Sequence, residues 1–413
     1  MKEKVKVFKF IAANILTRTG ISAIIVLSVI FYIGAVRLGN SSEAFSKAFA
    51  NTPKTSVTER IKGFEKDFNN NFESLQKVSV DVTSLADNAQ GKRVMQTPTM
   101  LLAFDTDGLL HRIMPNINIT KKLANLKEVM LRMKSKNYKT VYVAVPSSVI
   151  KGITVLPSGV TDFENATIDK VIKTLKIASI RTLDLRQEFT KDGIDPQDIF
   201  YNTDHHWKIT YSFQGAMQIA RYLNASYKLN LDPNNVYSNI NNYNSKTIPK
   251  VYSGSYMDAG GSSFVGDPDD FTSLIPKFAT DYRFRSYTRS GEIQHLSSGS
   301  KKAMDYTGTF PETLYDGRPT YTGYYNGGNT EIRVNNNFVA NNLKCMVVGT
   351  SNARPASAFL STYFKELRFI DTQGGRFSRN LYTYVDDYNP DVVLFMYPGW
   401  AFDDPNVFNY VIK

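Results

Sequence analysis

The chain has 413 residues, of which 42% are hydrophobic and 21% are charged, so it can bury a substantial core in one large or two ordinary domains. This composition excludes a disordered chain, a collagen and a coiled-coil array. The single cysteine, Cys345, excludes an intramolecular disulfide and any metal centre built from cysteines. The formal net charge is +11, but no run of Lys and Arg is interleaved with aromatic residues, so we expect no nucleic-acid partner.

The N-terminus has the pattern of a membrane anchor. Residues 1–37 carry a net charge of +5, and their lysine-rich end precedes an uncharged apolar run from Gly20 to Val36. At 1.5 Å per residue this run nearly spans the hydrocarbon core of a bilayer, which is about 30 Å thick. A cleaved signal peptide is the alternative, but the following residues fit a cleavage site poorly. We therefore expect a single-pass transmembrane helix in the cell membrane, with the N-terminus cytoplasmic and the rest extracytoplasmic.

A linker and an amphipathic helix are expected next, over residues 38–95. Between Val57 and Leu75 apolar residues recur at spacings of three and four, which places them on one face of a helix. We therefore divide the chain into a tail and anchor over 1–37, this linker and helix, and a main domain over 96–413.

Strands and helices alternate along the main domain. The pattern predicts strands over 101–104, 109–110, 140–145, 181–185, 344–348, 367–370 and 391–397, and helices over 121–136, 168–177, 209–223 and 354–364. Such alternation favours a parallel sheet with helices on both faces. Between about 225 and 340 the chain is rich in Asn, Ser, Gly and Tyr without a sustained period, so we expect an irregular, partly β insertion there.

One motif, from Tyr201 to Trp207, places an acid and two histidines in a loop that opens a helix. Asp204 is followed directly by His205 and His206. Because one residue separates Asp204 from His206, both side chains can project from the same side of an extended loop, where the carboxylate receives the imidazole proton. His205 is then expected to point elsewhere.

A second motif places Ser351 where a hydrophobic strand turns through Gly349 into a helix. Active groups of α/β folds lie at this carboxyl end of a parallel strand, because the helix amides stabilise negative charge. A serine hydroxyl needs a base to remove its proton and a third group to orient that base; His206 and Asp204 are the candidates. The backbone amides of Ser351 and Asn352 are candidates for an oxyanion hole. The alternative is a serine that only caps the helix.

A metal site is the alternative use of an Asp-His-His segment. Two-metal sites need further Asp and His ligands, and the remaining histidines, His111 and His295, lie in unrelated segments. We therefore expect no metal.

The two motifs together resemble a known family. The Asp-His-His-Trp segment at 204–207, Tyr201 before it, the later turn at 349–351 and the strand before Pro146 match in order the DHHW proteins. These are similar to the alginate O-acetylation enzymes of the SGNH (GDSL-like) hydrolase superfamily. The resemblance covers roughly 55–413 and implies a three-layer αβα sandwich with a parallel central sheet. It also implies an Asp-His-Ser triad and acetyl transfer to, or removal from, a glycan.

We expect an extracytoplasmic serine O-acetyltransferase that acts on an exopolysaccharide or cell-wall glycan through an acyl-serine, without a cofactor. Acetyl-CoA is absent outside the cell, so a membrane-bound O-acyltransferase is the expected acetyl donor. Two alternatives stay open: a polysaccharide acetylesterase, which passes through the same acyl-serine, and a catalytically silent carbohydrate-binding or scaffolding protein. Thr350, where the family usually has Asp, favours the silent protein. The candidates for substrate contacts are Tyr201, Tyr256, Tyr324 and Tyr325.

Overall fold

The computed structural model describes Val80, Ser84, 87–299, Tyr321, 330–373, 375–377 and 380–410. The expected membrane anchor at Gly20–Val36 and the expected amphipathic helix between Val57 and Leu75 lie outside these residues. Among the residues that are described, no helix is long and apolar enough to cross a bilayer.

The chain divides into two compact units. The smaller unit holds the described residues up to Met100 and the excursion Ser255–Asp267, and the larger unit holds the rest. The described residues of the smaller unit include β1 (Val94–Gln96), α8 (Ser255–Gly260) and α9 (Ser262–Val265). Within it, the amide of Phe264 donates a hydrogen bond to the Ser84 hydroxyl at 2.6 Å.

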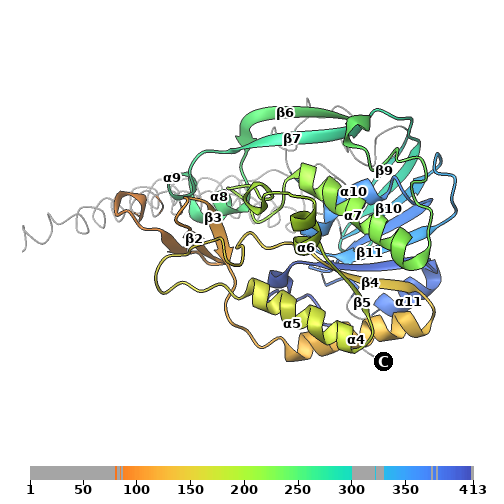
Figure 1. Cartoon of the computed structure of the whole chain (residues 1–413), viewed down its shortest axis with the longest axis horizontal. Coiled ribbons are helices and arrows are strands. Elements are labelled where there is room, and N and C mark those ends of the chain that lie inside the picture. Colours follow the sequence, from red (N-terminus) through yellow and green to blue (C-terminus); the bar gives the residue numbers. More distant parts are fainter. Residues whose placement is uncertain are drawn as a thin grey trace, which may run out of the picture. The chain divides into compact units, whose positions relative to one another are not determined.

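An eight-stranded mixed sheet forms the centre of the larger unit (Figure 1). In spatial order its strands are β5 (Arg181–Asp184), β4 (Lys139–Ala144), β13 (Val392–Tyr397), β11 (Lys344–Gly349), β12 (Glu366–Asp371), β10 (Glu331–Asn336), β8 (Tyr282–Tyr287) and β9 (Ile293–Gly299). The first five strands are parallel and the last three are antiparallel. The expectation of a parallel sheet is thus right for five strands and wrong for three. Those three come from the segment at about 225–340 expected to be an irregular, partly β insertion, so the strands agree with this expectation but their place in the central sheet was not predicted.

Helices cover both faces of this sheet, as the alternation of elements predicted (Figure 1). One face carries α4 (Thr120–Ser135), α5 (Glu164–Ile177) and α11 (Leu381–Tyr388), and the other carries α6 (Leu185–Lys191), α7 (Ile209–Tyr227) and α10 (Arg354–Leu360). Successive side chains of β4 point to opposite faces of the sheet. Val141 and Val143 pack in the hydrophobic core beneath α7, and Tyr142 packs in the core beneath α4. Parallel strands buried on both faces are apolar along their whole length for this reason. The sequence analysis did not predict α11.

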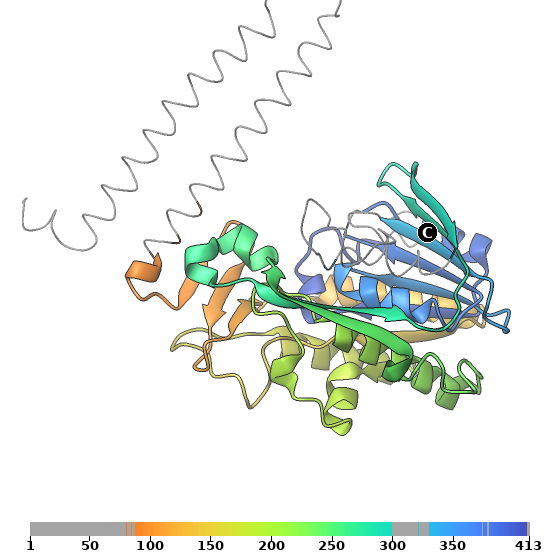
Figure 2. The same cartoon turned by 90° about the horizontal axis from the view of Figure 1, so that it is seen from above.

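Smaller elements complete the larger unit. The hairpin of β2 (Leu101–Phe104) and β3 (Leu110–Ile113) is antiparallel, as is the ribbon of β6 (Tyr243–Tyr252) and β7 (Asp269–Pro276), which Figure 2 shows as one long element. The 3₁₀ turns are η1 (Pro196–Asp198), η2 (Ile240–Asn242), η4 (Ser351–Ala353) and η5 (Gly399–Phe402). The strands and helices predicted for the main domain are all present, with ends shifted by up to four residues.

Candidate active site

Ser351 lies in the turn between β11 and α10. The strand β11 ends at Gly349, where a Cβ would lie 2.7 Å from the Met396 carbonyl oxygen and 2.8 Å from the Cβ of Ala353. Only glycine permits so close an approach. The 3₁₀ turn η4 then begins at Ser351, with Thr350 as its N-cap residue. Ser351 is therefore at the carboxyl end of a central parallel strand, as predicted.

The Asp-His-His segment lies in a closed loop directly before α7. Phe200 and Trp207 form a β-bridge across the base of this loop. From outside, the carboxylate of Asp269 on β7 accepts hydrogen bonds from the amides of Asn202 (3.0 Å) and Thr203 (2.7 Å) and from the Thr203 hydroxyl (2.6 Å). The β6–β7 ribbon thus fixes the position of the loop. The sequence analysis did not identify this support.

Asp204, His206 and Ser351 form one hydrogen-bonded chain. Nδ1 of His206 lies 2.8 Å from Oδ2 of Asp204, and Nε2 of His206 lies 2.8 Å from Oγ of Ser351. Asp204 and His206 are buried, whereas Ser351 is half-buried. The structure thus brings together the residues proposed as acid, base and nucleophile. With one imidazole nitrogen facing each partner, the arrangement suits removal of the serine proton by His206.

His205 does not point elsewhere, contrary to expectation. Its backbone N–H donates to Oδ1 of Asp204 at 2.8 Å, and its Nδ1 lies 3.1 Å from the same oxygen. Each carboxylate oxygen of Asp204 therefore faces one histidine: Oδ1 faces His205, and Oδ2 faces His206. Burial and the adjacent His206 lower the pKa of His205 to about 4, so its ring is neutral near pH 7.

Asp204 has a further partner that the sequence analysis missed. The hydroxyl of Tyr252, at the end of β6, donates a hydrogen bond to Oδ2, the oxygen that also faces His206. Burial raises the pKa of the carboxyl, but the adjacent His206 and His205 outweigh this and hold the pKa of Asp204 well below its usual range. Gly254 passes so close that a Cβ there would lie 2.2 Å from the Asp204 Cβ. No local motif marks Tyr252 or Gly254, so only the tertiary structure reveals them.

Two aromatic residues join the histidine loop to the serine turn. The ring of Tyr321 stacks on that of His206, with centroids 4.2 Å apart. The Tyr321 hydroxyl and the Nε1–H of Trp207 both donate to the carbonyl oxygen of Asn352, at 2.9 and 2.8 Å. Trp207 is fully buried, as expected of a core residue. These bonds fix the distance between the base and the nucleophile.

The backbone amide of Ser351, one of the two candidate oxyanion donors, has an internal partner. The N–H of Ser351 donates to Oε1 of Gln373 at 3.1 Å, so a carbonyl oxygen already lies where that amide would meet an oxyanion. Gln373 follows β12, next to β11 in the sheet, and its Nε2 lies 3.4 Å from Oδ2 of Asp404. Asn352 is buried, and its side chain donates to the His205 carbonyl oxygen at 3.3 Å. A substrate must therefore displace Gln373 to reach the Ser351 amide.

Two of the four tyrosines proposed for substrate contacts, Tyr201 and Tyr256, are buried. Tyr201 is 2% exposed, with its ring centroid 4.4 Å from that of Tyr252, and Tyr256 in the smaller unit is fully buried. A ring without an exposed face cannot stack on a sugar, so burial corrects the expectation for both residues. Tyr324 and Tyr325 lie outside the described residues.

Asp204, His205 and His206 also meet the distance criterion for a metal site, since one ligand atom of each lies within 4.8 Å of the others. These atoms have other partners, however. Oδ2 of Asp204 accepts from Tyr252, and Nε2 of His206 faces the Ser351 hydroxyl. A metal ion would have to break these hydrogen bonds, so the donor set fits a proton-transfer chain better than a metal centre.

Known proteins share this fold and part of this sequence. Residues 104–247, which include the histidine loop, match the family model described as SGNH hydrolase-like domain, acetyltransferase AlgX. Bacillus cereus PatB1, solved with a sulfonyl adduct, is 17% identical with a TM-score of 0.59, over 76% of this chain and 99% of its own. A DHHW family protein from Eubacterium siraeum is 16% identical with a TM-score of 0.54, over 78% of this chain and 99% of its own. No curated protein sequence matches. The resemblance to the DHHW proteins is confirmed, and the chain has an SGNH hydrolase-like α/β fold with a mixed sheet.

Proposed function

We propose that this chain is a polysaccharide O-acetyltransferase that carries the acetyl group on Ser351. The observation that carries the proposal is the chain from Asp204 through His206 to Ser351, with 2.8 Å at both links. The matching family model describes an acetyltransferase, which supports acetyl as the transferred group.

In the first half-reaction His206 Nε2 takes the proton of Ser351 as Oγ attacks the acetyl carbonyl of the donor. The bond between the acetyl carbon and the donor oxygen breaks, and that oxygen leaves with the proton held by His206. In the second half-reaction a glycan hydroxyl attacks acetyl-Ser351 and gives its proton to His206. Ser351 Oγ then leaves and recovers this proton, so the enzyme returns to its starting state.

Asp204 orients the imidazole through Nδ1 and stabilises its positive charge in both half-reactions. The developing oxyanion binds the Ser351 amide after the side chain of Gln373 has moved away. Displacement of Gln373 would thus couple substrate binding to completion of the site.

The proposal places this reaction outside the cell membrane. Its basis is the apolar run Gly20–Val36 with basic residues before it. A membrane-bound O-acyltransferase would then supply the acetyl group, because acetyl-CoA is cytosolic. Protease treatment of intact cells tests the topology: the main domain should be digested while the N-terminal tail is protected, and the reverse result would contradict it.

Mass spectrometry of the acceptor tests the transfer itself. The full chain is incubated with p-nitrophenyl acetate and an exopolysaccharide or cell-wall fraction of the source organism. Wild type should place acetyl esters on the glycan, and Ser351→Ala should not. If wild type released only free acetate, the chain would be an esterase and not a transferase. If it formed neither acetylated glycan nor free acetate, a catalytically silent binding protein would be favoured.

A further inference from the structure

A cleft lies at the carboxyl ends of the parallel strands, the side of the sheet on which Ser351 is also found. Its volume of about 560 Å³ is within the usual range for small-molecule sites, about 300–1,000 Å³. Its walls come from the segment after β4, the start of α5, the end of β5, α6 and η1. Since only β13 separates β4 from β11 and strands are about 4.8 Å apart, the carboxyl ends of β4 and β11 are about 10 Å apart.

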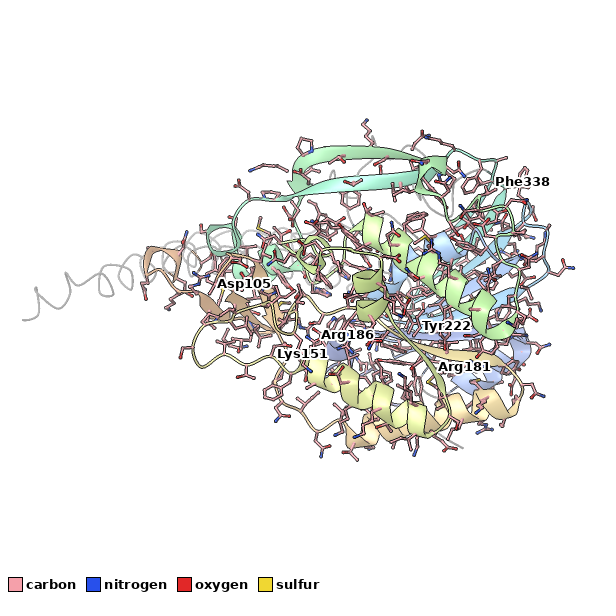
Figure 3. The ribbon with its side chains drawn as sticks, viewed as in Figure 1. Asp105, Lys151, Arg181, Arg186, Tyr222 and Phe338 are labelled. Atoms are coloured by element: carbon pink, nitrogen blue, oxygen red, sulfur yellow. The ribbon has the colours of Figure 1, made fainter. Side chains whose placement is uncertain are left out.

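A fixed network of polar side chains lines one wall of this cleft. Arg186 donates to both oxygens of Asp184 (2.9 and 2.8 Å), to Oδ1 of Asn165 (2.9 Å) and to Oδ1 of Asp169 (2.6 Å). Lys151 adds a looser contact, 3.8 Å from the other oxygen of Asp169. Figure 3 shows Lys151 and Arg186 in this region, by α5 and α6. Each group is thus held in place before a ligand arrives.

The charge balance of this network favours a neutral, hydroxyl-rich ligand. Two carboxylates compensate Arg186, so a phosphate or a carboxylate ligand would gain little from it. Asp169 is half exposed and keeps acceptor capacity for ligand hydroxyls. Exposed Gln187 on α6 adds a side-chain amide. The carboxylate of Asp169 and the side-chain amide of Gln187 can thus form hydrogen bonds with the hydroxyls of a sugar.

Besides Ser147, Thr190 and Lys191, the lining contains six apolar side chains. They are Pro146, Val149, Ile150, Phe189, Pro196 and Ile199. The C–H face of a sugar ring is apolar, whereas its rim carries the hydroxyls. Half-buried Ile150 and Pro196 keep apolar surface for such a face, so a cleft that combines them with polar groups suits a sugar chain better than a fully polar metabolite.

The cleft is also connected to the wall of the active site. Ser147, in its lining, donates to Oε2 of Glu164 at 2.9 Å, and the backbone amide of Trp400 donates to Oε1 of the same carboxyl at 3.2 Å. The Trp400 ring in turn meets the ring of His205 edge-on, with centroids 5.3 Å apart. A contiguous series of contacts through Glu164 and Trp400 thus links the cleft to His205.

We propose that this cleft is a subsite for the acceptor glycan, where it binds a neutral stretch of sugar units beside the unit that receives acetyl. Its role in acetyl transfer rests on the proposed function, but its capacity to bind sugar does not. The expected side-chain determinants are Asp169 and Gln187, both outside the acid-histidine-serine chain.

Binding of a neutral oligosaccharide without turnover tests the proposal. The probe is cellotetraose, titrated by saturation-transfer NMR into the full chain carrying Ser351→Ala. In that background Asp169→Asn removes a carboxylate from the cleft, and Gln187→Trp fills the cleft without removing a described hydrogen bond. Asp387→Asn is the matched control, because this exposed aspartate on α11 is outside the cleft.

Asp169→Asn should weaken cellotetraose binding by about tenfold or more, the effect of losing a hydrogen bond to a charged group. Gln187→Trp should weaken it by a similar factor because the indole occupies the cleft, and the control should bind like the parent. Unchanged binding in both cleft variants, or no binding by the parent, would overturn the proposal. Tighter binding of tetragalacturonic acid than of cellotetraose would overturn the neutral ligand class. Cleft binding without acetyl transfer by wild type would contradict the proposed function alone.

Discussion

Removal of the Tyr252 hydroxyl tests whether its hydrogen bond to Oδ2 stabilises the ionised carboxylate of Asp204. In Tyr252→Phe the carboxylate of Asp204 loses one donor to Oδ2, while His206 remains on that oxygen and the His205 amide on the other. A hydrogen bond to a charged group contributes about 1.5–3 kcal/mol, equal to a factor of about 10–160 in rate if all of it is lost in the transition state. Because other donors remain, we expect the lower end, a fall of about tenfold in kcat/KM.

The assay is hydrolysis of p-nitrophenyl acetate, combined with urea unfolding between pH 3 and 7. The pKa of Asp204 is well below the ordinary 3.8, so the stability that its ionised form contributes is present above pH 3.8 and lost as the pH falls further. The stability deficit of Tyr252→Phe should therefore be full at pH 7 and shrink in acid. An unfolding deficit of about 1.5 kcal/mol or more is expected at pH 7.

Tyr243→Phe is the matched control. Tyr243 is buried at the other end of β6, and its hydroxyl donates to the Tyr237 carbonyl oxygen at 3.0 Å, a neutral acceptor. We expect a deficit of about 1 kcal/mol that does not change with pH, and full activity. If Tyr252→Phe behaved like this control in both measurements, the inferred support of Asp204 by Tyr252 would be refuted.

Three further variants probe the site and its surroundings. Gly254→Ala places a Cβ against Asp204 and should lower kcat/KM on p-nitrophenyl acetate by about 100-fold, the effect of a misplacement of about 1 Å; near-normal activity would contradict the close packing. Burial raises the pKa of Glu164 to about 7, so its contribution to stability is full below pH 4.5 and lost as pH rises through 7. In urea unfolding, wild type should lose on the order of 3 kcal/mol of unfolding free energy over this pH range, and Glu164→Gln should not. Parallel curves of unfolding free energy against pH for the two proteins would contradict this. Loss of activity of about 10⁴-fold is expected for His206→Ala and much less for His205→Ala, with no effect of EDTA on wild type; equal losses would overturn the choice of base.

The parallel half of the fold could be predicted from the sequence because its signals are local. Strands such as β11 and β13 are continuous apolar runs, and helices such as α7 repeat apolar residues every three or four positions. The antiparallel half has no such signal. In β8, Arg283 and Arg285 alternate with buried Tyr282 and Phe284 over only a few residues, and most of β6 is exposed and polar. These strands therefore lack a continuous apolar run and depend on pairing with distant partners.

The three reactive side chains could be predicted because two short motifs contain them. Their supports could not, because Tyr252 lies 48 residues after Asp204 and Asp269 lies 66 residues after Thr203 in the chain. Gln373, on the Ser351 amide, likewise belongs to a loop after another strand. Of the expected sugar contacts, Tyr201 and Tyr256 were wrong, because the residue type alone does not distinguish a buried tyrosine from an exposed one.

The most direct test of the central claim is to trap the acyl-enzyme. The full chain is mixed with p-nitrophenyl acetate, quenched with acid within the first turnovers and digested, and the peptides are analysed by mass spectrometry. In wild type we expect one acetyl group, on Ser351. In Ser351→Ala the peptide that contains the turn should carry no acetyl group, and His206→Ala should form less acetyl-Ser351 than wild type. An acetyl group on another residue that persists in Ser351→Ala with unchanged turnover, or turnover by wild type with no acetyl on Ser351, would contradict the central claim.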